Sequence, residues 1–166
     1  MIVTPPKTGS TSLHKWLGAQ GWVTIMGPQF DDGVIEKHTC ARPWQYHMRE
    51  QKKCILIVRN PYDRMCSLHK HWQKFWKRTD GMYTFLRTVI GSEQFYSKDL
   101  KSYWDAASAT IFVKLEEIHL IKNHIDASGL PTVENVGEGV SSHTDFTRNF
   151  TRVLYARDFS FFGYEE

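Results

Sequence analysis

Residues 4–13 read Thr-Pro-Pro-Lys-Thr-Gly-Ser-Thr-Ser-Leu, and this stretch decides the fold. It follows a short apolar start and precedes a helical pattern, in which apolar residues recur at spacings of three and four: Leu13, Trp16 and Leu17. The sequence therefore predicts a strand over residues 1–4, a tight loop, and a helix over about residues 9–19.

The loop has the composition of an anion-binding site. The first amides of a helix have no partner within the helix, and the helix dipole favours negative charge at that end. Gly9 lets the backbone approach a ligand closely, and Lys7 supplies a positive charge. The surrounding hydroxyl groups add hydrogen-bond donors. They belong to Thr8, Ser10, Thr11 and Ser12.

The order of residues separates this loop from a Walker A motif, which needs a Gly-Lys-Ser/Thr sequence after an earlier glycine. Here Lys7 precedes Gly9. The run Pro-Lys-Thr-Gly-Ser-Thr-Ser resembles instead the 5′-phosphosulfate loop of the sulfotransferases that use 3′-phosphoadenosine 5′-phosphosulfate (PAPS). Taken alone, a loop of this composition also fits a generic phosphate site.

A second strand-to-helix turn follows at residues 54–61. Residues 54–58 are apolar and predict a buried strand. Asn60 then suits the N-cap and Pro61 the first position of a helix that reaches about residue 78. Its apolar and aromatic face recurs at spacings of three and four, and we expect it to point inward. That face consists of Tyr62, Met65, His69, Trp72 and Trp76.

Residues 58–67 resemble the 3′-phosphate motif of the same family, in which an Arg at the strand end and a Ser eight residues later hold the 3′-phosphate. Arg59 and Ser67 have that spacing. An Arg guanidinium suits the task because its planar fork donates two bonds to one phosphate. In an open α/β sheet, turns of this kind lie at the carboxyl ends of the strands, where ligands bind.

The end of the chain carries a third likeness. Residues 155–164 resemble the Tyr-x-x-Asp-Phe-x-x-Phe-Gly-Tyr close of Golgi-type and related bacterial sulfotransferases. Because five aromatic side chains occur within ten residues, we expect this segment to cap a core.

The resemblance implies transfer of a sulfuryl group, for which we predict Lys7 and His38 as catalytic residues. Lys7 would neutralise the charge that grows on the departing phosphate. His38, in a Lys-His-x-x-Ala segment that resembles many relatives, would act as the general base, and its ordinary pKa near 6.5 suits that role. The other candidates for the base are Glu36, His69 and His71.

The adenosine side of the site is less clearly marked in the sequence. Relatives place a loop against the nucleotide at the position of residues 135–143, where Ser141, Ser142 and His143 are the available donors. The basic residue expected beside them does not occur until Arg148 and Arg152.

Composition restricts the broad class of protein. The 166 residues predict one domain over residues 1–166, and a net charge of +3 suits an anionic ligand without indicating nucleic acid. Three scattered cysteines give neither a disulfide framework nor a zinc pattern, and we expect no metal site. No apolar run is long enough to cross a membrane, and the motif loop begins at residue 4. We therefore expect a cytoplasmic enzyme of bacterial or phage type, with no membrane partner.

The sequence thus predicts an α/β protein with a three-layer, P-loop-like fold, in which helices flank a mainly parallel central sheet. The resemblance implies a PAPS-dependent sulfotransferase that modifies a hydroxyl or amine of a small-molecule acceptor, with carbohydrate favoured. The product of the donor would be 3′-phosphoadenosine 5′-phosphate (PAP). Two alternatives remain open, namely a small-molecule kinase and a nucleotide-binding module without catalysis.

Overall fold

The computed structural model describes residues 2–25, 39–41, 54–90, 99–107, 109–131 and 142–165. The chain forms two compact units, each assembled from two separate stretches of sequence. The first contains residues 1–58 and 102–136, and the second contains residues 59–101 and 137–166. A single domain over residues 1–166 stays a prediction.

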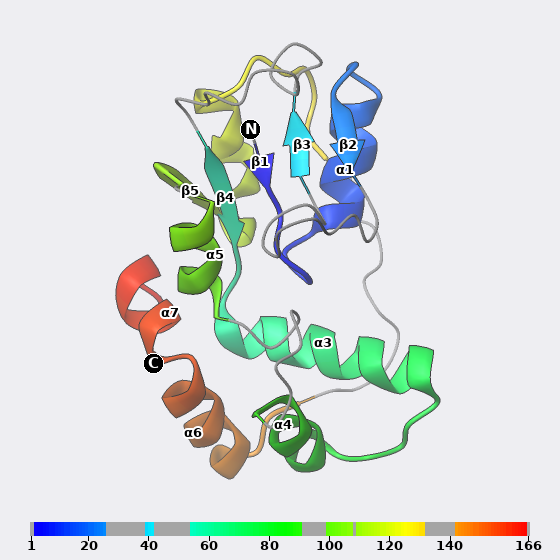
Figure 1. Cartoon of the computed structure of the whole chain (residues 1–166), viewed down its shortest axis with the longest axis vertical. Helices are drawn as coiled ribbons and strands as arrows, with labels where there is room; N and C mark the ends of the chain where they lie inside the picture. Colours follow the sequence, from blue (N-terminus) through cyan, green and yellow to red (C-terminus); the bar gives the residue numbers. More distant parts are fainter. Residues whose placement is uncertain are drawn as a thin grey trace. The chain divides into compact units, whose positions relative to one another are not determined.

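The first unit is built on a five-stranded sheet with the order β2-β3-β1-β4-β5. Strand β4 runs parallel to both β1 and β5, whereas β3 is antiparallel to β1 and to β2 (Figure 1). The strands are β1 (Ile2–Val3), β2 (Val23–Ile25), β3 (Thr39–Ala41), β4 (Ile55–Val58) and β5 (Ile111–Lys114). The predicted α/β class is confirmed, and the parallel part of the sheet consists of β1, β4 and β5.

Helices contact both faces of this sheet. Helix α1 (Ser10–Gly18) and the 3₁₀ helix η2 (Leu115–Asn123) pack on one face. On the other face, Trp104 of α5 (Leu100–Ala106) makes an edge-on ring contact with Phe112 of β5, with centroids 6.1 Å apart. The shared core of the first face is apolar throughout and comprises Ile2, Leu13, Leu17, Trp22, Ile55, Ile57, Val113 and Ile121.

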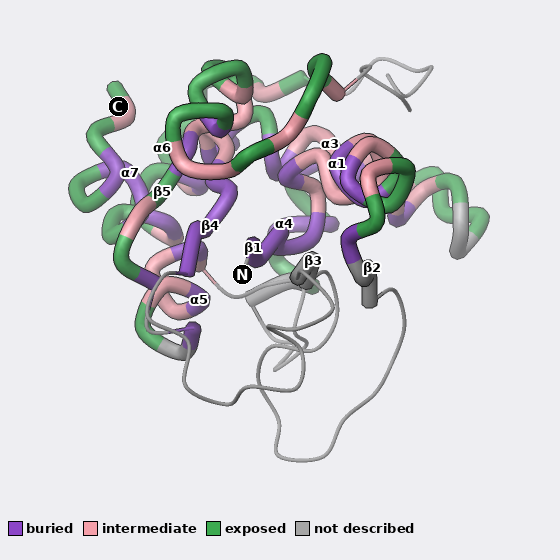
Figure 2. The backbone as a smooth tube through the Cα atoms, turned by 90° about the horizontal axis from the view of Figure 1, so that it is seen from above, coloured by how far each residue is buried: buried purple, intermediate pink, exposed green. Residues whose placement is uncertain are grey.

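Burial on both faces explains why β4 reads as a continuous apolar run. All four of its residues are buried, and Figure 2 shows the buried colour along β1 and β4. A strand covered on one face only would show alternating polarity. Strand β3 lies between β1 and β2 and is only three residues long, and so short a segment gives no period that sequence analysis can detect.

The second unit is helical. It contains α3 (Pro61–Trp76), α4 (Met82–Ile90), α6 (Asp145–Leu154) and α7 (Ala156–Phe162). The predicted inward face of α3 is confirmed for the residues whose side chains are described. The core of this unit gathers apolar and aromatic side chains of α3, α4 and the C-terminal segment. These are Tyr62, Met65, Leu68, Trp72, Met82, Phe85, Leu86, Tyr155 and Phe159.

The aromatic close of the sequence ends in helix α7, and its role in the core is confirmed. Tyr155, Phe159 and Phe162 are each about 1% exposed. Asp158 of the same segment is fully buried, and its two carboxylate oxygens accept hydrogen bonds from the amides of Leu100 and Lys101, both at 2.8 Å. The motif therefore also caps the N-terminus of α5, which the sequence alone did not reveal.

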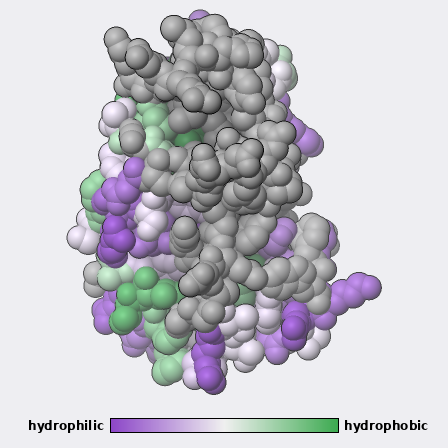
Figure 3. Space-filling model, viewed as in Figure 1, coloured by the Kyte–Doolittle hydropathy of each residue, from purple (hydrophilic) through white to green (hydrophobic). Residues whose placement is uncertain are grey.

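The described surface mixes polar and apolar side chains (Figure 3). Within the second unit, Phe146 and Val153 of α6 and Phe161 of α7 are the large apolar residues exposed on the C-terminal helices. In the described ranges, no helix combines the length and the apolar character that crossing a membrane requires.

Candidate functional site

The loop after β1 is closed by hydrogen bonds to one carbonyl group. The oxygen of Pro5 accepts from the amide of Thr8 at 3.1 Å and from the hydroxyl of Thr8 at 2.7 Å. At the entrance of the loop, the buried hydroxyl of Thr4 is hydrogen-bonded to Nε2 of His14 in α1 at 3.0 Å. The loop is therefore fixed both internally and to the helix that follows it.

Two residues of this loop adopt left-handed backbone conformations. Lys7 has φ 68° and Gly9 has φ 82°. Gly9 is the N-cap of α1, and its carbonyl accepts the amide of Leu13 at 3.1 Å. A Cβ atom placed on Gly9 would lie 2.6 Å from Cδ1 of Leu115, at the start of η2. The backbone angle favours glycine at position 9, and a Cβ atom there would require the Leu115 side chain to shift.

The start of α1 has the features of an anion-binding helix terminus. Among the described residues no side chain caps it, and no acidic residue lies in its first turn. Ser10, Thr11 and Ser12 are partly exposed there, and Lys7 is half-buried just before them. Thr8 differs from the other predicted donors, because it is fully buried and its hydroxyl donates to Pro5. Its observed contribution is thus to the shape of the loop.

The second predicted turn begins where β4 ends. Because β1 and β4 are neighbouring parallel strands, their carboxyl ends lie at the same edge of the sheet. Arg59 is the next residue after β4, and the first of the second unit. Asn60 caps α3 by accepting the amide of Tyr62 at 2.9 Å, and Pro61 is the first helical residue, as predicted.

Arg59 and Ser67 both belong to the second unit, and both are half-buried. Ser67 lies in the second turn of α3, whose start is fixed by the Asn60 cap. The loop residues Lys7 to Ser12 belong to the first unit. The structure therefore groups the predicted phosphate ligands into two local sets, one in each unit.

The candidates for the general base divide into two groups. His38 and Glu36 lie outside the described residues, so their assignment stays a prediction. His69 is 4% exposed, with Nε2 2.9 Å from the carbonyl oxygen of Asp80 and its ring 5.2 Å from that of Phe85. These contacts give His69 a structural role in the core of the second unit. His71 is half-buried on α3.

Of the donors predicted on the adenosine side, Ser141 lies outside the described residues and Ser142 is exposed. His143 is half-buried, and its Nε2 lies 3.1 Å from the carbonyl oxygen of Tyr62, so this nitrogen donates. Burial lowers the pKa of His143, which favours the neutral ring. The segment before α6 is thereby hydrogen-bonded to the start of α3.

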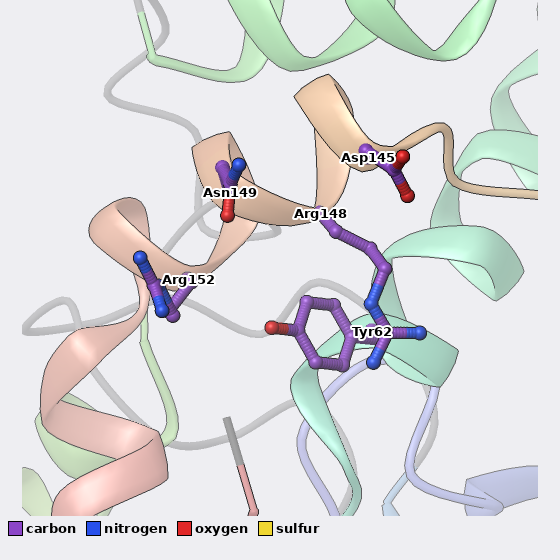
Figure 4. A pocket seen from close by; sticks show the side chains of 5 residues that line it. All are labelled: Tyr62, Asp145, Arg148, Asn149 and Arg152. Atoms are coloured by element: carbon purple, nitrogen blue, oxygen red, sulfur yellow. The ribbon is translucent and has the colours of Figure 1, made fainter.

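Arg148 and Arg152 lie together in the second unit, in a pocket of about 290 Å³ (Figure 4). The Arg148 guanidinium lies 4.2 Å from the centroid of the Tyr62 ring. The pocket is lined by Tyr62, Asp145, Arg148, Asn149 and Arg152. Sequence analysis noted the two arginines but missed the pocket. The signal was present, because its four α6 residues recur at spacings of three, four and seven and so share one helix face.

Among the residues that the structure describes, no group of three or more His, Cys, Asp or Glu side chains is placed to hold a metal ion. Comparison with protein-family models, with curated proteins and with solved structures finds no match to the chain.

Proposed function

We propose that this protein is a PAPS-dependent sulfotransferase of P-loop-like architecture that acts in the cytoplasm. The observation that carries the proposal is the strand-loop-helix unit of residues 2–18. Its loop holds Lys7 and Gly9 in left-handed conformations and leads into a helix start without a side-chain cap or an acidic residue. That arrangement supplies backbone donors, hydroxyl donors and one positive charge to an anion.

The second turn supports a ligand with two phosphate groups. Strand β4 is parallel to β1 and adjacent to it, and Arg59 follows β4 directly. Two strand-to-helix turns with phosphate-binding side chains suit a nucleotide that carries a 5′-phosphosulfate and a 3′-phosphate. In the proposal, the residue 4–12 loop binds the 5′ side, and Arg59 with Ser67 binds the 3′-phosphate.

The proposed reaction is an in-line transfer. The oxygen of an acceptor hydroxyl attacks the sulfur of PAPS, a new S–O bond forms, and the bond from sulfur to the bridging phosphate oxygen breaks. His38 takes the proton of the hydroxyl, and PAP leaves with the electron pair of the broken bond. Lys7 and the amides at the start of α1 stabilise the charge that develops on the 5′-phosphate of PAP. An amine acceptor reacts in the same way through its nitrogen.

The test is a sulfuryl-transfer assay with PAPS and a panel of carbohydrate, phenol and amine acceptors, read by mass spectrometry of the product. We expect transfer to at least one acceptor. We also expect Lys7→Ala to lower kcat by about a hundredfold or more, while Lys15→Ala, an exposed lysine in the same helix, stays within twofold.

Two outcomes contradict the proposal in different ways. Transfer of phosphate from ATP with Mg²⁺, and none of sulfuryl from PAPS, would assign the protein to the small-molecule kinases. Binding of PAP without turnover on any acceptor would leave a nucleotide-binding module. A loss of activity in His38→Ala that Glu36→Gln does not reproduce would support His38 as the base.

A further inference from the structure

The pocket on α6 presents polar groups from one face of a single helix. Asp145, Arg148, Asn149 and Arg152 occupy successive turns of that face, and Tyr62 comes from the start of α3. Figure 4 shows the Arg148 side chain extending from α6 across to the Tyr62 ring. All five residues belong to the second unit, so the geometry is that of one compact body.

Tyr62 lines this pocket, and its ring and backbone are fixed by contacts with neighbouring residues. Its side chain is 8% exposed, and its ring lies 4.9 Å from that of Phe159 and 5.6 Å from that of His143. Its amide donates a hydrogen bond to the side chain of Asn60, and its carbonyl oxygen accepts a hydrogen bond from Nε2 of His143. A ring fixed on its other sides offers Arg148 a rigid surface for stacking.

Stacking prepares Arg148 to bind an oxyanion. The guanidinium donors lie in the plane of the group, so contact of its face with an aromatic ring leaves the donor edges directed away from the ring. The stacked group has also lost part of its rotational freedom, which reduces the entropy cost of binding. A planar fork held in this way matches the two oxygens of a carboxylate, sulfate or phosphate.

The remaining lining groups favour a ligand with hydroxyls beside the oxyanion. Two arginines and one aspartate give the pocket a formal charge of +1. The Asn149 amide and the Asp145 carboxylate can both form hydrogen bonds with hydroxyl groups of a ligand. Neither of them adds positive charge to the pocket. The volume of about 290 Å³ lies just below the range of small-ligand pockets, and all the lining residues except Tyr62 are exposed, so the pocket suits a ligand no larger than a single sugar that binds at the surface.

We propose that the pocket of Tyr62, Asp145, Arg148, Asn149 and Arg152 binds a small polyhydroxy ligand that carries one oxyanion, such as a sugar phosphate or sugar acid. The proposal goes beyond the sulfotransferase assignment and does not depend on it. Two sources share this chemistry, a free phosphorylated or acidic sugar and the ribose phosphate of a nucleotide.

The experiment is calorimetric titration of the whole chain with ribose 5-phosphate, ribose and inorganic phosphate. We expect ribose 5-phosphate to bind more tightly than either of its parts. Arg148→Ala, Arg152→Ala and Arg148→Lys should each weaken its binding about tenfold or more, because each removes charged hydrogen bonds or the fork. Asp145→Asn should tighten binding severalfold, because it removes a like charge.

The matched control is Arg157→Ala, since Arg157 is an exposed arginine of α7 that pairs with Asp99 at 3.4 Å outside the pocket. It should leave the affinity within twofold. Equal binding of ribose and ribose 5-phosphate would overturn the proposal. An affinity for ribose 5-phosphate that is unchanged in Arg148→Lys and in Arg152→Ala would also overturn it. Far-ultraviolet circular dichroism of each variant checks that its fold is intact.

Competition with PAP distinguishes the two sources. If PAP displaces ribose 5-phosphate and Arg148→Ala weakens both, the ligand is the ribose phosphate of a nucleotide. If both bind at once, the ligand is a separate sugar phosphate or acid. Lys7→Ala should weaken PAP and spare ribose 5-phosphate, and a chain that binds ribose 5-phosphate but not PAP would contradict the sulfotransferase proposal alone.

Discussion

Gly9 and Leu115 approach each other so closely that a Cβ atom on Gly9 would lie 2.6 Å from Cδ1 of Leu115. Leu115 begins η2 directly after β5, so this contact joins the loop after β1 to the segment that follows β5. Gly9 is also the N-cap of α1, so the contact lies at the start of that helix.

Replacing Gly9 by alanine should therefore reduce stability for two separate reasons. The backbone angle of φ 82° is strained for any side chain, and the new methyl group meets Leu115. Gly21→Ala is the matched control, because its φ of 77° is similar but nothing lies within 4 Å of its Cβ position. We expect urea unfolding to show a loss of about 1–2 kcal/mol for Gly21→Ala, and about 1–2 kcal/mol more for Gly9→Ala.

A double variant separates the two contributions. Leu115→Ala removes the methyl groups that Gly9→Ala would meet, so the double variant should lose less than the sum of the two single losses. Equal losses for Gly9→Ala and Gly21→Ala would show that the close approach of Leu115 to Gly9 has no energetic weight.

Replacing either of two buried threonines of α6 by valine should change the stability of the protein, but in opposite directions. The hydroxyl of Thr147 accepts the amide of the N-cap residue Thr144 at 2.8 Å, so Thr147→Val should cost about 1 kcal/mol. The hydroxyl of Thr151 is buried and has no hydrogen-bond partner among the described residues, so Thr151→Val should gain up to about 1 kcal/mol. Thermal denaturation of both variants checks this, and a loss in Thr151→Val would contradict it.

Among the residues of the C-terminal segment, Asp158 should be the one whose replacement reduces stability most. Its buried carboxylate accepts the first two amides of α5, so Asp158→Ala leaves both without that partner. We expect the free energy of unfolding to fall by about 2–4 kcal/mol. Asp99→Asn is the control, because Asp99 pairs with the exposed Arg157 at 3.4 Å, and it should cost less than Asp158→Ala.

The ionisation of Asp158 should also make stability depend on pH. Burial raises its pKa from 3.8 to about 6, although the Arg64 charge and the two amides lower it in part. The folded state therefore binds the proton more tightly than the unfolded chain. The stability from this group is fully present below pH 3.8 and is lost as the pH rises through about 6.

The measurement compares the wild type with Asp158→Asn. Their difference in free energy of unfolding should change by up to about 3 kcal/mol between pH 4 and 7, with the wild type relatively more stable at the acidic end. A difference that is constant over this range, or one that changes in the opposite direction, would contradict the raised pKa.

The elements with strong periodicity could be predicted from the sequence. The inward face of α3 was read correctly because its 16 residues show the helical period, and β4 was read correctly because its four consecutive apolar residues indicate a buried strand. Strand β3 and helix α5 were missed. The first has three residues and the second has seven, and the N-terminus of α5 is capped by Asp158, which is 58 residues away from Leu100 in sequence. Such a distant cap leaves no local signal.

The candidate site was predictable where local backbone chemistry determines it. The Asn60 cap and Pro61 at the first helical position follow from residue type, whereas the close approach of Gly9 to Leu115 was not predicted. The burial of the Thr8 hydroxyl could not be predicted from residue type, because its acceptor is a backbone carbonyl that any residue would supply. The stacking of Arg148 on Tyr62 requires α6 to pack against α3, which no local pattern encodes.

The central claim is that two phosphate-binding turns hold one nucleotide, and calorimetry with PAP tests it most directly. PAP, 5′-AMP, and ATP with Mg²⁺ should be titrated into the wild type and into Arg59→Ala, with Arg78→Ala, an exposed arginine after α3, as the control. We predict that PAP binds without metal at least tenfold more tightly than 5′-AMP, and that Arg59→Ala alone removes this advantage. Equal affinities for PAP and 5′-AMP, or a preference for ATP with Mg²⁺, would contradict the account.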